Sequence, residues 1–161
     1  MVGTVKRVVA LGKNLAVFRG YKTGKSFVTS AYCPHLGADL TSCGGGKVKG
    51  DDIVCPFHEW AFSGEDGKCT DIPYSNGSQV TRITSSGKMF HPPVTHFLIQ
   101  IPENFRLKTM PSMEANGLIY VWYHAENSEP NWYPPILENS LEWAKQPGGW
   151  VYQGRNEYEV K

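Results

Sequence analysis

The sequence predicts an all-β fold of small antiparallel sheets, and three observations support this prediction. Glycine and proline are abundant, at 17 and 11 of 161 residues, which favours turns over long helices. Aromatic residues make up 12% of the chain and are enriched in strands generally. Runs rich in β-branched residues, such as the one with Val5, Val8 and Val9, alternate with turn signals. At this length we expect one domain, with room for only the edge of a second.

Short strands are expected between the turn signals. The first hairpin is expected to turn at residues 12–14, and a later one at residues 65–67. Residues 105–110 and 117–123 are expected to pair with each other around residues 114–116. The remaining strands are expected at residues 4–11, 15–19, 26–30, 47–49, 53–55, 60–63, 68–71 and 150–160.

Two short stretches of the chain carry one cysteine and one histidine each. One residue separates Cys33 from His35, and two residues separate Cys55 from His58. A proline follows each cysteine and stiffens the loop, because its ring fixes φ. Two thiolates and two imidazoles are the ligand set of a Rieske 2Fe–2S cluster, in which cysteines hold one iron and histidines the other. The sequence therefore predicts Cys33, His35, Cys55 and His58 as metal ligands and cofactor-binding residues.

A structural zinc module is the alternative for these four residues, since zinc also accepts two cysteines and two histidines. Zinc fingers usually place two cysteines together and then two histidines together, whereas here cysteine and histidine alternate along the chain. The alternation favours the iron–sulfur cluster. Trp60 and Phe62 alternate with smaller residues, so we expect both rings to pack in the core beneath it. Asp39 is expected in a surface turn, or alternatively as a hydrogen-bond acceptor behind the ligands.

The residues around the four ligands resemble known cluster-binding boxes. Residues 31–40 and 55–60 look like the two boxes of Rieske proteins. The flanking stretches are similar to the Neverland-type cholesterol 7-desaturases of animals, which are Rieske oxygenases of steroid hormone synthesis. These stretches are residues 64–69, 72–74, 117–123 and 150–155. The resemblance covers nearly the whole chain and implies a Rieske iron–sulfur fold, with a cluster-binding subdomain of two loops carried on hairpins.

Three features depart from the resembled pattern. Glu59 stands where the family usually has glycine, so the turn after His58 is expected to be strained or differently routed. Nineteen residues separate His35 from Cys55, slightly more than usual, and the excess is expected in a longer hairpin tip. Ala38 and Phe57 stand where respiratory-chain Rieske proteins carry a cysteine pair, which argues against the respiratory class.

The resemblance implies the following function and partners. The chain would transfer one electron through its 2Fe–2S cluster, as the Rieske part of a sterol oxygenase like cholesterol 7-desaturase. An NAD(P)H-dependent flavin reductase would supply the electron, which would leave through the exposed edge of His35 or His58. The acceptor would be a mononuclear non-haem iron in the oxygenase catalytic domain, on a neighbouring subunit of a head-to-tail trimer. A stand-alone Rieske ferredoxin is the alternative function.

The expected organisation is a Rieske domain at residues 1–125, with its cluster-binding subdomain at about residues 31–75. Residues 126–161 are expected to be a connector and the first strand of a catalytic domain that this chain lacks. No set of two histidines and a carboxylate with helical spacing follows Asn116, so no mononuclear iron site and no catalytic residue are expected here. Whether the chain itself is an enzyme is left open, although the resembled family consists of oxidoreductases.

Residues 80–100 match no expected family segment. A translated intron and a lineage-specific surface loop are both compatible with this stretch. Every Val codon begins with GT and one Gln codon ends in AG, so Val80 and Gln100 are compatible with the splice boundaries of an intron. A surface loop is also compatible, because long insertions add little closure entropy. His91 and His96 lie within it and are not expected to be iron ligands, because ligands are normally held by ordered supporting residues.

Composition and charge limit the remaining function classes. Sixteen basic and 15 acidic residues give a nearly neutral chain, which indicates no nucleic-acid or anionic-membrane partner. Cys43 and Cys69 are expected to be free thiols in a reducing compartment, and His124 is expected to be exposed. No apolar run is long enough to span a bilayer. We expect a cytoplasmic monomer for this chain, and the endoplasmic reticulum membrane for full-length relatives.

Overall fold

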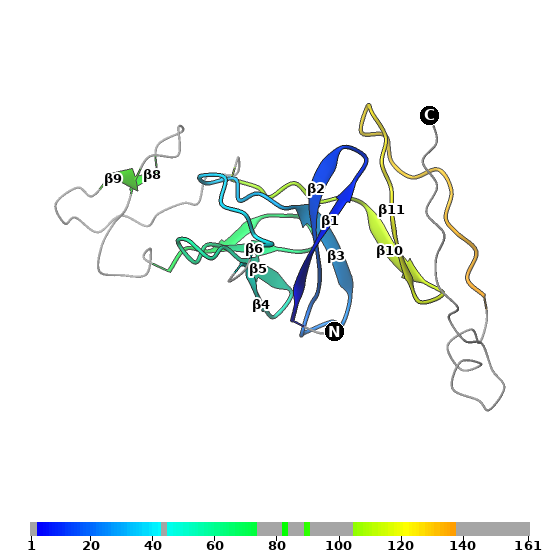
Figure 1. Ribbon diagram of the computed structural model, residues 1–161, viewed down its shortest axis with the longest axis horizontal. Coiled ribbons are helices and arrows are strands. Elements are labelled where there is room, and N and C mark those ends of the chain that lie inside the picture. Colours follow the sequence, from blue (N-terminus) through cyan, green and yellow to red (C-terminus); the bar gives the residue numbers. More distant parts are fainter. Residues whose placement is uncertain (1–2, 43–44, 74–81, 84–88, 91–104, 138–161) are drawn as a thin grey trace.

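The structure is a computed structural model that describes residues 3–42, 45–73, 82–83, 89–90 and 105–137. Within these residues every regular element is a β-strand and every strand pair is antiparallel, which confirms the predicted all-β class (Figure 1). No helix that could span a membrane occurs among the described residues.

The first sheet is a three-stranded meander in the order β1-β2-β3. Its strands are β1 (Val5–Ala10), β2 (Lys13–Arg19) and β3 (Ser26–Ser30), close to the predicted ranges. β2 and β3 supply its buried side chains, whereas most of β1 is exposed. β3 runs directly into the first cysteine–histidine loop, so this sheet sets where that loop begins.

The first hairpin turns one residue earlier than predicted. Ala10 pairs with Lys13, which leaves Leu11 and Gly12 as the two turn residues. Both have positive φ, at 55° and 66°, as a type I′ turn requires. The predicted turn at residues 12–14 was therefore wrong, because the twist of paired strands selects this tight turn even with leucine at its first position.

The second sheet has four strands in the order β4-β5-β6-β7. These are β4 (Lys47–Lys49), β5 (Asp52–Val54), β6 (Ala61–Ser63) and β7 (Cys69–Asp71), each within one residue of its prediction. The second cysteine–histidine loop joins β5 to β6. Each of the two loops is therefore anchored on strands of a different sheet.

The prediction that residues 105–110 pair with residues 117–123 was wrong. Instead β10 (Ser112–Ala115) pairs with β11 (Leu118–Val121) through a tight turn at residues 116–117. Residues 105–110 lie between the two sheets and hydrogen-bond to both. The bonds are Ser30 N–H to Lys108 O (2.7 Å), Met110 N–H to Val28 O (2.8 Å) and Leu107 N–H to Gly67 O (2.8 Å). Partners so distant in sequence leave no local pattern, which is why sequence reasoning missed them.

Several predicted features lie outside the described residues. The strand at 150–160, Cys43, His91 and His96 are among them. Within the 80–100 stretch the structure describes one short strand pair, β8 (Arg82–Ile83) and β9 (Met89–Phe90).

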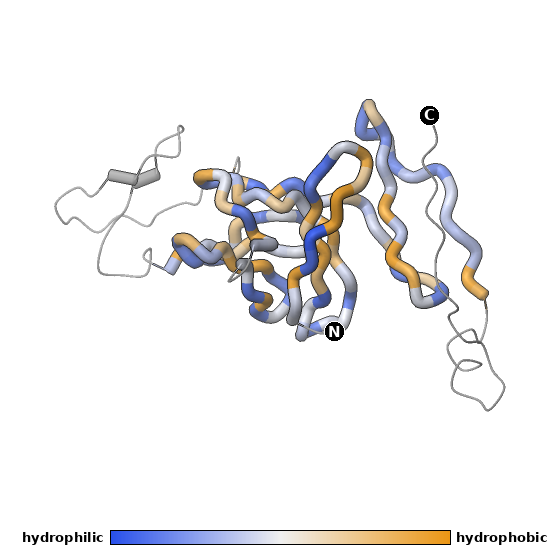
Figure 2. The backbone as a smooth tube through the Cα atoms, in the orientation of Figure 1, coloured by the Kyte–Doolittle hydropathy of each residue, from blue (hydrophilic) through white to orange (hydrophobic). Residues whose placement is uncertain are grey.

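The main core lies between the two sheets and continues under the cysteine–histidine loops. The hydrophobic stretches of the chain run along the strands in the middle of the molecule (Figure 2). Trp60 and Phe62 are both fully buried in this core, as predicted. Its buried members are Ala16, Phe18, Phe27, Cys33, Ala38, Leu40, Ile53, Cys55, Trp60, Phe62, Ile72, Phe105 and Leu107. A smaller buried cluster lies on the side of β2 and β3 that faces the β10–β11 hairpin. It consists of Leu15, Val28 and Met110.

One ion pair fastens the β10–β11 hairpin to the first sheet. Glu114 on β10 accepts hydrogen bonds from Arg19 on β2 (2.7 Å) and from the Ser26 hydroxyl on β3 (2.9 Å). The hydrogen bond from Arg19 holds the pKa of Glu114 below its ordinary value. Because the pair is partly exposed, its contribution to stability is modest.

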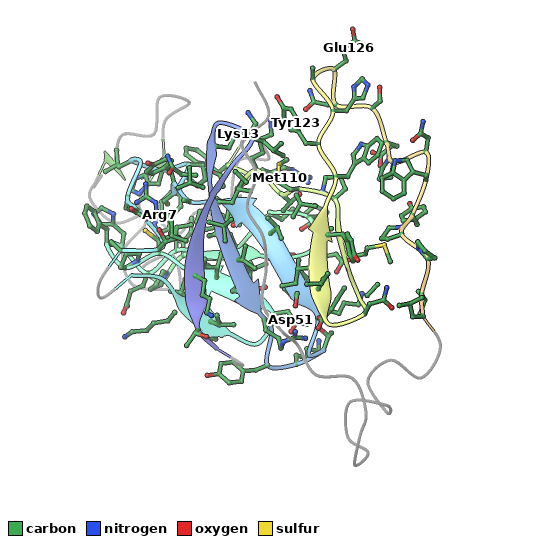
Figure 3. The ribbon with its side chains drawn as sticks, turned by 45° about the vertical axis from the view of Figure 1, so that its right-hand side comes forward. Arg7, Lys13, Asp51, Met110, Tyr123 and Glu126 are labelled. Carbon is green, nitrogen blue, oxygen red and sulfur yellow. The ribbon has the colours of Figure 1, made fainter. Side chains whose placement is uncertain are left out.

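Glu114→Gln should therefore lower the free energy of unfolding near neutral pH by no more than about 1 kcal/mol, and the melting temperature should fall accordingly. A carboxylate with a depressed pKa stabilises the fold above its unfolded-state pKa, and that contribution disappears as pH falls through the folded-state pKa. The difference from the natural chain should thus be larger at pH 7 than at pH 3, in thermal melts followed by circular dichroism. Glu126→Gln, in the loop after β11 (Figure 3), is the control and should have no effect at either pH. An undiminished difference at pH 3 would contradict this account.

Candidate metal centre

The two cysteine–histidine loops have the same main-chain hydrogen bonds. In the first, Cys33 N–H donates to Ala38 O (2.9 Å) and Gly37 N–H donates to Cys33 O (2.9 Å). In the second, Cys55 N–H donates to Trp60 O (2.8 Å) and the N–H of the residue four positions after Cys55 donates to Cys55 O (3.0 Å). Each cysteine is thus bonded to the residue five positions later, and each loop is closed as one compact turn.

This shared loop geometry places one residue of each loop in the left-handed region. Gly37 has φ of 74°, and at the equivalent position of the second loop Glu59 has φ of 56°. Nothing lies within 4 Å of a side chain added at Gly37, so the backbone conformation and not space favours glycine there. The expectation of a strained turn after His58 is confirmed, because a side chain in this region costs about 1–2 kcal/mol.

The fold brings the four predicted site residues together as two like pairs. The side chains of Cys33 and Cys55 lie close enough for each to affect the ionisation of the other. The rings of His35 and His58 lie edge to face with centroids 5.0 Å apart. Within the described residues, no three His, Cys, Asp or Glu side chains form a group that could hold a metal ion. Two like pairs suit a group with two metal atoms better than a single ion.

The two sulfur atoms lie in an environment that favours one thiolate. The nearby Cys33 side chain lowers the pKa of Cys55, and Cys55 in turn raises the pKa of Cys33. Burial opposes ionisation of both, whereas main-chain N–H groups favour it: His35 and Leu36 donate toward Cys33, and the two residues before Glu59 donate toward Cys55. Loops whose amides point at sulfur are suited to hold thiolate ligands and to tune a metal bound to them.

His35 is held more tightly than His58. Its ring stacks on the indole of Trp60, with centroids 4.1 Å apart and planes 5° apart. Phe105 packs edge-on against the same indole, with ring centroids 5.6 Å apart. His35 is only 8% exposed, while His58 is half-buried. The core thus fixes the orientation of one imidazole and leaves the other closer to solvent.

A polar network that the sequence gave no reason to expect braces the base of the first loop. Arg7 on β1 donates to Asp39 (2.9 Å) and to Asn14 (2.8 Å), and Asn14 donates to the Tyr32 hydroxyl (3.1 Å). Figure 3 shows Arg7 at the side of the molecule where the first loop lies. Tyr32 and Asp39 also form an isolated antiparallel bridge on either side of the loop. Arg7 and Asp39 are 32 positions apart, so no local pattern could have predicted their contact.

Asp39 is half-buried in its bridge to Tyr32 and does not lie in the predicted surface turn, and its carboxylate accepts hydrogen bonds behind the first loop. Its carboxylate receives the Thr41 hydroxyl (2.6 Å) and the Thr41 N–H (2.8 Å). These bonds, together with the Arg7 charge, hold the pKa of Asp39 below its ordinary value. Of the predicted free thiols, Cys69 is free and half-buried, and burial raises its pKa to about 11. His124 is exposed, as predicted.

A β-domain with two equivalent cysteine–histidine loops over a shared aromatic core has the arrangement expected of an iron–sulfur domain with mixed cysteine and histidine ligands. The Rieske [2Fe-2S] domain family matches residues 2–92, more than half of the chain. The chain therefore belongs to the Rieske domain family, which confirms the resemblance drawn from its two boxes.

Relatives and solved structures agree with this assignment. The chain is 44% identical over 158 residues to cholesterol 7-desaturase nvd of Xenopus laevis, covering 98% of this chain and 28% of that protein. It is 40% identical over 159 residues to cholesterol 7-desaturase nvd 1 of Ciona intestinalis, covering 98% and 27% respectively. The chain thus spans under a third of these relatives. Its fold matches dicamba monooxygenase with a TM-score of 0.55 at 22% identity, covering 83% of this chain and 32% of that one.

Replacing Glu59 by glycine should stabilise the fold, because glycine adopts the left-handed conformation without a side-chain penalty. The expected gain is about 1 kcal/mol, measured by chemical denaturation. Gly37→Ala is the matched test in the first loop and should destabilise by a similar amount. A loss of stability in Glu59→Gly would show that the glutamate side chain makes a stabilising contact instead.

Trp60→Phe should be much less destabilising than Trp60→Ala. The alanine variant leaves a cavity beneath His35 and should cost about 3–5 kcal/mol. The phenylalanine variant keeps a ring under the imidazole, and it removes an indole N–H that is buried with no hydrogen-bond partner among the described residues. Urea denaturation of the three proteins compares these costs. Equal losses in both variants would mean that the stacked ring is unimportant.

Proposed function

We propose that this chain is an electron-transfer domain in which Cys33, His35, Cys55 and His58 hold a Rieske 2Fe–2S cluster. The observation that carries the proposal is the convergence of two equivalent loops, which pairs the two cysteines with each other and the two histidines with each other. The cysteines suit one iron and the histidines the other. When bound, the cluster supplies a site that accepts and gives up one electron at a time.

The chain's own residues orient and protect this site. The buried cysteines and the amides directed at them hold the sulfur ligands away from water. Trp60 fixes the plane of His35, and the Arg7–Asp39 pair braces the loop that carries it. A rigid ligand shell keeps structural rearrangement small when the charge of the site changes, which favours rapid electron transfer.

The two histidines differ in their suitability as the route for the electron. The sequence alone did not decide whether the electron leaves through His35 or through His58. His35 is buried and stacked on Trp60, whereas His58 is half-buried beside the exposed Phe57. We therefore assign the exit to the edge of His58, where a partner can approach most closely.

The proposed acceptor is the non-haem iron of a sterol oxygenase like the cholesterol 7-desaturases that the chain resembles. The relatives are more than three times longer than the matched region, which leaves ample length for a catalytic domain. The connector after β11 exposes large apolar side chains, which suit burial against such a domain better than a finished ferredoxin surface. They are Trp132, Tyr133, Ile136 and Leu137, and Figure 2 shows the hydrophobic end of this segment. We further propose an NAD(P)H-dependent flavin reductase as electron donor, and the endoplasmic reticulum membrane as the site of the longer protein.

Iron and labile-sulfide analysis, combined with visible and electron paramagnetic resonance (EPR) spectra of the reduced protein, tests the cluster. The natural chain should contain iron and sulfide in equal amounts and show a Rieske spectrum. His58→Ala should abolish cluster assembly, because one iron would lose half of its protein ligands. His124→Ala removes an exposed imidazole from the connector and should retain the natural spectrum.

Two results would contradict the proposal. A colourless protein that contains only zinc would support the structural zinc module and remove every electron-transfer claim. A natural spectrum in His58→Ala would mean that the ligands are assigned incorrectly.

A further inference from the structure

Glu59 is the only formally charged residue in the two cysteine–histidine loops, residues 33–38 and 55–60. At the base of the first loop the charges of Arg7 and Asp39 offset each other at 2.9 Å. Within the described residues, the Glu59 carboxylate has no ion pair and no hydrogen bond, and the residue is exposed. The proposed electron exit therefore has one uncompensated negative charge, one residue away from His58.

The main chain gives an independent reason to regard this carboxylate as functional. Its left-handed conformation is the one that glycine adopts at the equivalent position of the first loop. Among residues other than glycine, asparagine and aspartate enter this region most readily, and glutamate has no such advantage. Strained residues of this kind concentrate at functional sites, where the surrounding structure maintains them. Because the glutamate side chain makes no hydrogen bond or ion pair within the described residues, its charge remains as the polar property that it contributes.

A large apolar residue next to each of the two histidines is exposed. Leu36 at the tip of the first loop is 65% exposed, and Phe57 in the second is 69% exposed. Large apolar side chains beside a single charge, around a half-buried histidine, are typical of a protein interface with an apolar centre and a polar rim.

We propose that Leu36, Phe57 and Glu59 form a docking edge that selects an electron partner with a positively charged patch. This inference rests on the proposed function of the chain as an electron carrier. A charge at the rim of an interface acts mainly on the rate of encounter and on its salt dependence. The carboxylate therefore accelerates encounter with cationic partners and slows encounter with anionic ones, and salt suppresses both effects.

Stopped-flow oxidation of the reduced, cluster-loaded chain tests the proposal with three oxidants of known charge. Each oxidant molecule accepts one electron: anionic ferricyanide, cationic hexaammineruthenium(III), or oxidised cytochrome c as a basic protein partner. At low ionic strength, Glu59→Gln should reduce the ratio of the cation rate to the anion rate about threefold or more, and should slow cytochrome c. The change should shrink at high salt. Glu126→Gln, at the tip of the loop after β11, is the matched control and should leave the ratio unchanged (Figure 3).

Glu59→Gly separates charge from backbone strain. Both variants lose the charge, so both should change the rate ratio equally, while only the glycine variant should raise the melting temperature. An unchanged ratio in Glu59→Gln overturns the proposal, as does a change confined to Glu59→Gly. Absence of iron and of an EPR signal in the natural chain would instead overturn the proposed function, so the two failures are distinguishable.

Discussion

The paired main-chain hydrogen bonds that close the two cysteine–histidine loops are the constraint on which the rest of the structure depends. In each loop, the N–H four residues after the cysteine donates to the carbonyl oxygen of that cysteine. The N–H groups two and three residues after the cysteine are directed at its sulfur. This arrangement satisfies main-chain hydrogen-bonding groups within a short loop. It also imposes the left-handed residue that glycine supplies in one loop and glutamate in the other.

The loops meet because the core beneath them is continuous. Trp60 closes the second loop through its carbonyl group and also lies flat against the histidine of the first. Phe105 reaches the same indole from a segment between the two sheets. A change in the packing of these rings would therefore move both loops at once, because a close-packed interior transmits displacement.

The sequence was a good guide to local features and a poor one to distant contacts. The core positions of Trp60 and Phe62 and the strands next to the loops were predicted correctly, because residue alternation is a local property. The four proposed ligands were named from their spacing, which is also local. The pairing of residues 105–110 was predicted wrongly, because their partners lie near residues 28–30 and 67–68. The brace from Arg7 to Asp39 was not foreseen, since an exposed arginine on an edge strand has many possible partners.

The sequence by itself determined the all-β class and the identity of the two loops, because both depend on residue types at short spacings. Only the tertiary structure decided that the cysteines and the histidines meet as separate pairs, that one histidine is buried and the other half-exposed, and that Glu59 occupies a strained position. These properties arise from contacts between segments that are distant along the chain. Composition and periodicity do not encode such contacts, because they become defined only when the core packs.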